Sequence, residues 1–191
     1  MTNNSHAQNS MAKHLIIYFG VSVVILILDL WSKSAATANL DYAVPVPVYT
    51  LFDALTGFNL TLLHNTGAAF SFLASESGWQ RWFFTLIAIS VSGVLCVWLM
   101  KLKEDEKWLA AALSLVIGGA LGNLYDRLAY GHVVDFIHVH WGPSYFPAFN
   151  IADSSISIAA GLLIYDFIIQ TLHTTLSFFI LFRPLHEVSI T

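Results

Sequence analysis

The sequence has little charge and a single cysteine, and both shortages narrow the class of protein. Only 10 % of the 191 residues are charged, whereas a soluble domain usually has about 25 %. Lys and Arg are fewer than Asp and Glu, and the net charge of −4 excludes a polybasic nucleic-acid-binding protein. Because Cys96 is the only cysteine, an internal disulfide and a zinc–thiolate cluster are excluded as well.

Apolar residues are abundant instead. They make up 57 % of the chain and give a mean hydropathy of +0.68, which is typical of an integral membrane protein whose apolar surface is covered by lipid. A helix needs about 20 predominantly apolar residues to cross a bilayer. Four stretches are long enough: residues 15–31, 82–100, 108–125, and a stretch that runs from 151 past 169.

The basic residues outside these stretches predict the orientation. Five lie on one side of the predicted membrane and three on the other, and the positive-inside rule places the richer side, with both termini, in the cytoplasm. In the alternative, the first stretch is a cleaved signal peptide, because residues 36–38 resemble a cleavage site, although Asp29 and three later spans oppose this. The five are Lys13, Lys101, Lys103, Lys107 and Arg183, and the three are Lys33, Arg81 and Arg127.

The two long connections on the non-cytoplasmic side, residues 32–81 and 126–150, contain strand-like patterns. Apolar and polar residues partly alternate over 58–63, and Val133 and Val134 form a β-branched pair. We therefore expect a small extracytoplasmic sheet on a helical bundle, in one membrane domain over residues 13–182. Residues 1–12 are expected to form a disordered cytoplasmic tail, and residues 183–191 a second cytoplasmic tail.

Four acidic residues gather at the predicted outer face. Asp29 and Asp126 lie near the outer ends of the first and third spans, Asp135 lies in the connection that follows, and Asp153 lies in the first turn of the fourth span. Ionisable groups at a membrane are costly and usually functional, so a site is predicted at this face. Asp166 lies deeper and is expected to hydrogen-bond to a neighbouring helix.

Glycines of the third span lie beside these acids. Gly118, Gly122 and Asp126 recur every four residues and share a helix face, while Gly119 and Asn123 share the adjacent face. Small residues let helices approach closely. We expect a glycine-lined cleft at the outer leaflet with carboxylates at its floor.

Two kinds of chemistry other than an acid pair remain open at this point. Lys33 could form a Ser–Lys dyad with Ser32 or Ser154, but Asp29 lies four residues before it and favours a plain ion pair. A cluster of three histidines beside Asp135 could bind a metal, but no metalloprotease motif occurs, so interfacial histidines near Trp141 are the favoured interpretation. The three are His132, His138 and His140.

Paired carboxylates are the third candidate. Asp135 and Asp153 flank one short connection, so both can face one cleft. Two carboxylates held close together share a proton, and the pair can then activate a water and protonate a leaving group. The alternative is structural, because Asp153 lies where a helix N-cap would and Asp135 can be an ordinary loop residue. Arg127 either pairs with Asp126 or binds a phosphate or carbonyl.

These residues belong to five sequence blocks that together resemble the motifs of the bacterial lipoprotein signal peptidases, the type II signal peptidases. The resemblance covers about residues 13–170, and the blocks occur in the family's order. They are Asp29-Leu-Trp-Ser-Lys33, Asn65-Thr-Gly-Ala-Ala-Phe70, the segment from Gly118 to Arg127 that contains Gly-Asn-Leu-Tyr-Asp-Arg, Val133-Val-Asp-Phe136, and Phe149-Asn-Ile-Ala-Asp-Ser154.

The resemblance implies a fold and an activity. It implies an all-α integral membrane protein with four transmembrane helices, a small extracytoplasmic β-cradle and a short amphipathic helix from the first long connection. It implies an aspartic endopeptidase of the bacterial inner membrane that removes signal peptides from diacylglyceryl-modified prolipoproteins, cutting just before the lipid-modified cysteine. No metal or cofactor is implied, and globomycin is the inhibitor expected of a family member.

Roles carried over by motif make Asp135 and Asp153 the catalytic pair at the periplasmic face. The surrounding residues are expected to orient the pair and to bind the substrate backbone in a monomeric enzyme that contacts membrane lipid and no nucleic acid. They are Asp29, Lys33, Asn65, Gly67, Asn123, Asp126, Arg127 and Asn150.

Two functions of other classes use the same residues. A transporter or channel would place polar groups through the whole depth of the bilayer, but here they crowd at one face. A structural membrane subunit would use the glycine-rich face only for packing, and Asp135→Asn would then be harmless.

Overall fold

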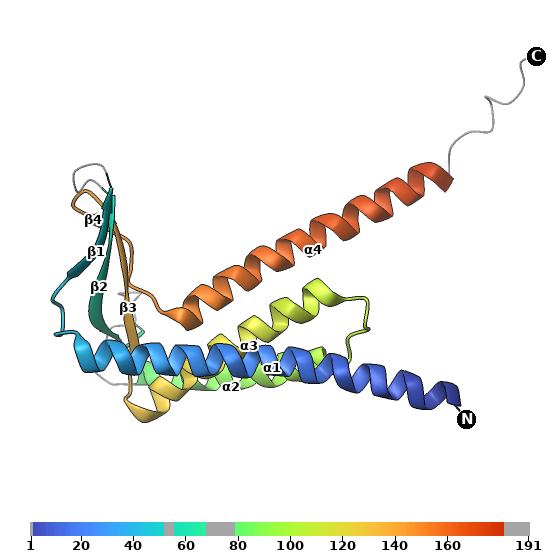
Figure 1. Ribbon diagram of the computed structural model, residues 1–191, viewed down its shortest axis with the longest axis horizontal. Coiled ribbons are helices and arrows are strands. Elements are labelled where there is room, and N and C mark those ends of the chain that lie inside the picture. Colours follow the sequence, from blue (N-terminus) through green and yellow to red (C-terminus); the bar gives the residue numbers. More distant parts are fainter. Residues whose placement is uncertain (1, 52–55, 68–78, 182–191) are drawn as a thin grey trace, which may run out of the picture.

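The computed structural model describes residues 2–51, 56–67 and 79–181. In this part of the chain it has four helices and four strands (Figure 1). In chain order they are α1 (Thr2–Asn39), β1 (Val46–Leu51), β2 (Thr56–Asn65), α2 (Trp79–Leu99), α3 (Lys107–Ala129), β3 (Val133–Trp141), β4 (Ser144–Tyr145) and α4 (Ile151–Leu181).

All four predicted spans are confirmed as helices long and apolar enough to cross a membrane. They cover Ala12–Asn39, Arg81–Leu99, Lys107–Ala129 and Ile151–Phe178. The first helix differs from the prediction at its start, because α1 begins at Thr2 and residues 2–12 are helical where we expected a disordered tail. Once a helix has nucleated, each further residue adds a hydrogen bond, so a stable span can extend into a polar flank.

The two long connections form one antiparallel sheet with the strand order β1-β2-β3-β4. The strand patterns at residues 58–63 and 133–134 are thereby confirmed as parts of β2 and β3. The fold is therefore four helices plus a sheet rather than purely helical. In residues 40–51 and 56–67 of the first connection the structure has strands and no helix; residues 52–55 and 68–78, which include the rest of that connection, lie outside the described residues, so the expected amphipathic helix stays a prediction.

Helix α3 lies at the centre of the bundle because its glycines let the backbones of α1 and α4 approach it closely. A Cβ on Gly118 would lie 2.7 Å from the Ser22 carbonyl oxygen of α1, and a Cβ on Gly119 would lie 2.6 Å from the Ala152 carbonyl oxygen of α4. A Cβ on Gly122 would overlap the Asp29 carboxylate. The predicted glycine faces are confirmed, but they serve close contact between helices rather than leaving empty space.

Helix α4 packs along α3 over its first half and then extends beyond the bundle. Trp108, at the start of α3, still contacts Tyr165 of α4. Figure 1 shows α4 diverging from α1, and the side chains that the structure describes over residues 167–180 are all exposed. At 1.5 Å per residue, a helix of 31 residues is about 46 Å long and exceeds the roughly 30 Å hydrocarbon core. The expectation for Asp166 is wrong, because its carboxylate accepts a hydrogen bond from Gln170 of the same helix, at 2.7 Å.

Candidate active site

The polar residues of the motifs meet where the last turns of α1 and α3 touch the start of β3 and the start of α4. Lys33 is the centre of this network and is 3 % exposed. Its Nζ lies 2.7 Å from Asp29 Oδ2 and 2.9 Å from Asp126 Oδ2. It also donates to Asn123 Oδ1 at 2.9 Å. The ion pair with Asp29 that the four-residue spacing predicts is confirmed, and Asp126 is a second carboxylate partner.

The two carboxylates that bind Lys33 also hold other elements in place. Asp29 accepts the backbone N–H of Ala152, in the first turn of α4, at 2.8 Å. Asp126 accepts the backbone N–H of Val134, at the start of β3, at 3.0 Å. Both side chains are almost fully buried. Buried carboxylates need such partners, and here the partners fix the positions of β3 and α4.

Asp135 and Asp153 are brought to one place by amide side chains. Asn150 Nδ2 donates to Asp135 Oδ1 at 2.8 Å, and Asn123 Nδ2 donates to Asp153 Oδ1 at 2.8 Å. The two asparagines are joined as well, because Asn150 Nδ2 lies 3.2 Å from Asn123 Oδ1. Through Asn123, the carboxylate of Asp153 is linked to Lys33.

The expected N-cap position of Asp153 is wrong, because Asn150 is the N-cap of α4 and Asp153 is its partner three residues later. Asn150 Oδ1 accepts the backbone N–H of Asp153 at 2.9 Å, and Asp153 Oδ2 lies 3.3 Å from the backbone nitrogen of Asn150. This reciprocal pair is a capping box with Asn150 as the N-cap. The second oxygen of Asp153 remains with Asn123, so one side chain both caps the helix and faces the site.

Asp135 is the acid whose ionisation the site disturbs most. Its pKa is raised to about 7, first by burial and then by the nearby carboxylate of Asp153. Hydrogen bonds from Asn65 and Asn150 and the charge of Lys33 act in the opposite direction. The bond from Asn65 Nδ2 to Asp135 Oδ2 is 3.0 Å long. Near neutral pH this carboxyl can therefore both give and take a proton.

The block around Asn65 is only partly described, because residues 68–70 lie outside the described residues. Its visible part forms a tight turn in which Gly67 N–H donates to Asn65 Oδ1 at 2.9 Å. Gly67 has a φ of +97°, and a Cβ there would lie 2.6 Å from the Phe84 ring. Only glycine fits this position without strain, which is the physical reason for glycine in the motif.

The serine and histidine alternatives are not assembled in the structure. Ser32 Oγ and Ser154 Oγ donate to the backbone oxygens of Asp29 and Asn150, and neither contacts Lys33. His138 and His140 both pack against Tyr145, whereas His132 stacks on His64 with ring centroids 4.0 Å apart. Among the described residues, no group of three or more His, Cys, Asp or Glu side chains is arranged to hold a metal ion.

Arg127 lies at the edge of the network rather than in a pair with Asp126. Its Nη1 donates to the backbone oxygen of Asn123 at 3.1 Å, and its guanidinium lies 5.5 Å from the centre of the Phe84 ring. The backbone bond is within α3, and the ring belongs to α2. Arg127 is thus held over the site by two helices, with Asp126 bound to Lys33 instead.

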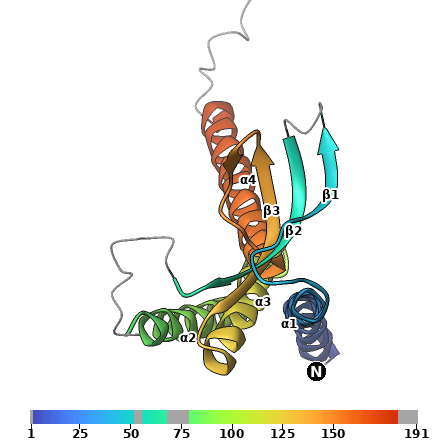
Figure 2. The same cartoon turned by 90° about the vertical axis from the view of Figure 1, so that its left-hand side faces the viewer.

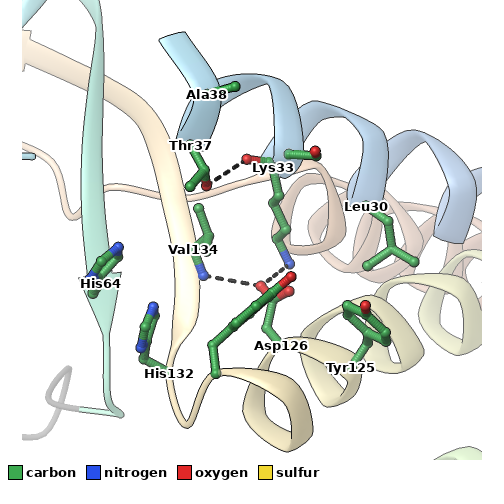
Figure 3. A pocket seen from close by; sticks show the side chains of 11 residues that line it. Leu30, Lys33, Thr37, Ala38, His64, Tyr125, Asp126, His132 and Val134 are labelled. Atoms are coloured by element: carbon green, nitrogen blue, oxygen red, sulfur yellow. Dashed lines mark hydrogen bonds and ion pairs between the residues drawn. The ribbon is translucent and has the colours of Figure 1, made fainter. Parts of the chain in front are cut away.

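A cavity of about 580 Å³ lies on the side of β3 that carries Val134, away from Asp135 and Asp153. The sequence did not predict it. Figure 3 shows His64 and His132 on one side of it, and Lys33 bound to Asp126 beside Val134. Burial, and then the neighbouring His64, lower the pKa of His132. Asp135 and Asp153 are not among the lining residues, so the cavity is separate from the place where the two acids meet.

Comparisons with known proteins find relatives that match most of the chain. A family model described as signal peptidase (SPase) II matches residues 21–169. A lipoprotein signal peptidase of Pseudomonas aeruginosa (strain UCBPP-PA14) is 56 % identical over 148 residues, which are 76 % of this chain and 84 % of that protein. A lipoprotein signal peptidase of Acinetobacter baumannii (strain AB307-0294) is 48 % identical over 166 residues, with coverage of 85 % and 91 %.

Solved structures resemble the fold as well. One bacterial membrane enzyme, determined by the in meso method at 2.3 Å resolution, is 28 % identical, has a TM-score of 0.69, and matches 92 % of this chain and 94 % of its own. Another, at 1.9 Å resolution, is 32 % identical with a TM-score of 0.67 and coverage of 78 % and 90 %.

Proposed function

Because the chain belongs to the signal peptidase II family, we propose that Asp135 and Asp153 are the catalytic pair with which it cleaves its substrates. The protein is a membrane hydrolase of the aspartic peptidase class that removes the signal peptides of prolipoproteins. The observation that supports the assignment is the amide network, in which Asn150 and Asn123 hold the two carboxylates beside each other.

The proposed mechanism assigns different roles to the two acids. Asp135 is assigned the proton of the pair, since its pKa, raised to about 7, lets it carry a proton near neutral pH. Ionised Asp153 takes a proton from a water between the carboxyls as the water attacks the scissile carbonyl carbon. Asp135 donates its proton to the carbonyl oxygen. As the C–N bond of the tetrahedral intermediate breaks, Asp153 passes the proton taken from water to the leaving amine, and a hydroxyl of the intermediate returns a proton to Asp135.

The surrounding residues keep this pair in position. Asn65, Asn123 and Asn150 donate to the carboxylates, and Gly67 shapes the turn that carries Asn65. Lys33, held by Asp29 and Asp126, gives the site one fixed positive charge. Arg127, with five N–H donors of which one is used in a backbone bond, is suited to bind substrate carbonyls.

The location of the site suits a substrate anchored in lipid. The polar network lies at the ends of α1 and α3 that meet the sheet, and we propose that this end faces the periplasm, with both termini in the cytoplasm of a bacterial inner membrane. A diacylglyceryl anchor would hold the scissile bond at this level, directly before the modified cysteine, and supply the proximity that catalysis needs. We place the monomeric enzyme in one domain over residues 13–182, with tails at 1–12 and 183–191, and expect inhibition by globomycin.

The test is the replacement of each acid by its amide. Asp135→Asn and Asp153→Asn are expected to lower turnover of a diacylglyceryl-modified substrate by at least about 10²–10⁴-fold, the usual contribution of a general acid or base. Cleavage is followed by gel shift with purified protein, and gel filtration with thermal unfolding verifies that the variants are folded.

Asp166→Asn is the matched control, because Asp166 contacts Gln170 on the exposed part of α4. It should turn over at the normal rate. Normal turnover by either Asp135→Asn or Asp153→Asn would remove that residue from the proposed catalytic pair.

A further inference from the structure

The cavity on the Val134 side of β3 takes no part in the proposed cleavage, because neither Asp135 nor Asp153 lines it. It lies between the last turns of α1 and α3 and the sheet, and Figure 2 shows these helix ends together at the end of the sheet where β3 begins. Its volume of about 580 Å³ is typical of a ligand site, which has about 300–1,000 Å³. We name it the α1–α3 cavity; its lining includes Leu30, Lys33, Tyr125, Asp126, Tyr130 and His132.

Lys33 has no donor left for a ligand in this cavity. An ammonium group has three N–H donors, and those of Lys33 are taken by Asp29, Asp126 and Asn123. Lys33 is also the only Lys or Arg among the described residues that line the cavity. The α1–α3 cavity is therefore poorly suited to an anion.

Asp126, in contrast, has one carboxylate oxygen without a partner among the described residues. Its contacts with Lys33 Nζ and with the Val134 N–H both end on Oδ2, so Oδ1 can still accept a hydrogen bond. The side chain is almost fully buried, and a buried carboxylate oxygen without a donor is costly. Asp29 and Asp126 share one ammonium, which leaves a net charge of −1 on these three groups. A positively charged donor would satisfy both the oxygen and the charge.

Four aromatic rings follow one another along the lining of the cavity. The ring centroids of Tyr125 and Tyr130 are 6.2 Å apart, those of Tyr130 and His132 are 6.2 Å apart, and those of His132 and His64 are 4.0 Å apart. Burial and the neighbouring His64 lower the pKa of His132, so this ring is neutral near pH 7. Aromatic faces attract an organic cation. The rings and Asp126 therefore favour the same kind of ligand.

An apolar track leads from the cavity along α1 toward the middle of the membrane. Leu30 shares a helix face with Ile27 and Val23, three and seven residues before it. Ile27 is 59 % exposed and Val23 is 52 % exposed. At the cavity itself Tyr125 and Tyr130 are exposed, and tyrosine is enriched at the level of the lipid headgroups. A ligand with a polar head and an acyl chain matches both parts.

We propose that the α1–α3 cavity binds the primary ammonium group of a phospholipid, as in phosphatidylethanolamine, with an acyl chain along the track of Ile27 and Val23. The ammonium donates to Asp126 Oδ1 beside the aromatic rings. Because Asp126 also holds the start of β3, the lipid binds at the base of the strand that carries Asp135. The proposal holds whichever residues catalyse cleavage.

Native mass spectrometry of the purified full-length protein in detergent tests this proposal by counting bound lipids. The probes are dioleoyl phosphatidylethanolamine and dioleoyl phosphatidylglycerol, which share their chains and phosphate but differ in the ammonium group. The double variant Tyr125→Leu/Tyr130→Leu removes two rings and keeps apolar bulk, and Ser34→Trp narrows the cavity from the α1 side. Tyr165→Leu is the matched control, because Tyr165 is an exposed tyrosine of α4 outside the described lining.

We expect the wild-type protein to bind one phosphatidylethanolamine about tenfold more tightly than phosphatidylglycerol. The double variant and Ser34→Trp should each lose about tenfold in phosphatidylethanolamine affinity, which is the size of two cation–π contacts, and Tyr165→Leu should bind as the wild type does. Equal affinities of the wild-type protein for the two lipids overturn the proposal, and so does undiminished phosphatidylethanolamine binding by both cavity variants. Glycerophosphoethanolamine, the headgroup without chains, should compete only weakly; competition at equal concentration would show a site for a soluble amine and overturn lipid as the occupant.

Discussion

Removing the amide of Asn65 should move the alkaline limit of activity to higher pH. In the proposed mechanism Asp135 must carry the proton, so activity falls as the pH rises through its pKa of about 7. Asn65 donates to Asp135 Oδ2 at 3.0 Å and thereby stabilises the charged form. Asn65→Ala removes this stabilisation, so the pKa of Asp135 rises and the protonated form persists at higher pH.

The size of the shift follows from the strength of one hydrogen bond. A hydrogen bond to a charged group contributes about 1.5–3 kcal/mol, and the lower value applies because Asn65 is only half-buried. One pKa unit corresponds to about 1.4 kcal/mol. The alkaline limb is therefore expected to move up by about 1 pH unit.

The assay is the pH dependence of kcat/KM for a diacylglyceryl-modified substrate, which reports the ionisation of the free enzyme. The maximal rate of the Asn65→Ala enzyme is expected to fall as well, because Asn65 Oδ1 also holds the Gly67 N–H, but the position of the limb is independent of that loss. Thr66→Ala changes the exposed neighbour and should leave the limb in place. A limb that stays at the wild-type pH, or moves to lower pH, would refute the role assigned to Asp135.

Three further predictions concern the network, the packing and the chemistry. Lys33→Ala leaves two buried carboxylates without their cation and should destabilise the protein by about 3–5 kcal/mol, which is measured as a lower Tm in detergent. The folded fraction of this variant should keep measurable turnover. Complete loss of turnover in folded protein would reopen a Ser–Lys mechanism. Gly122→Ala forces a Cβ into the Asp29 carboxylate and should lower the free energy of unfolding by about 1–3 kcal/mol. Gly161→Ala is the control and should leave the stability unchanged, because nothing lies within 4 Å of the added Cβ. Equal Tm values for the two variants would contradict this packing. A chelator should leave cleavage unchanged, and loss of activity that zinc restores would point back to the histidines.

Much of the fold could be predicted from local sequence. The four spans follow from the number of consecutive apolar residues, since lipid leaves a helix no alternative to internal hydrogen bonds. The glycine spacing in α3 correctly predicted two faces, because helical periodicity alone places Gly118 with Gly122 and Gly119 with Asn123. The strands over 58–63 and 133–134 follow from alternation and β-branching. At residues 2–12 the polar composition predicted disorder, and this was wrong because the adjoining helix extends cooperatively into the polar flank.

The candidate site could be predicted as a set of residues but not as a set of contacts. Topology placed the four acids at one end, and the resemblance singled out Asp135 and Asp153. Contacts between residues far apart in the chain decide which carboxylates pair with Lys33 and which remain free for catalysis. These residues are 15 to 123 positions apart, and the Asp29 carboxylate with the Ala152 N–H is the longest-range case. No local pattern encodes these distances.

The sequence by itself determined the membrane class, the spans and the residue types that the chemistry requires, because apolar length, periodicity and motif spacing are properties of neighbouring residues. Only the tertiary structure decided that Lys33 binds both Asp29 and Asp126 and that Asn150 joins Asp135 to the capping box of Asp153. The physical reason is that charge balance, burial and hydrogen-bond geometry are set by groups that only folding brings together.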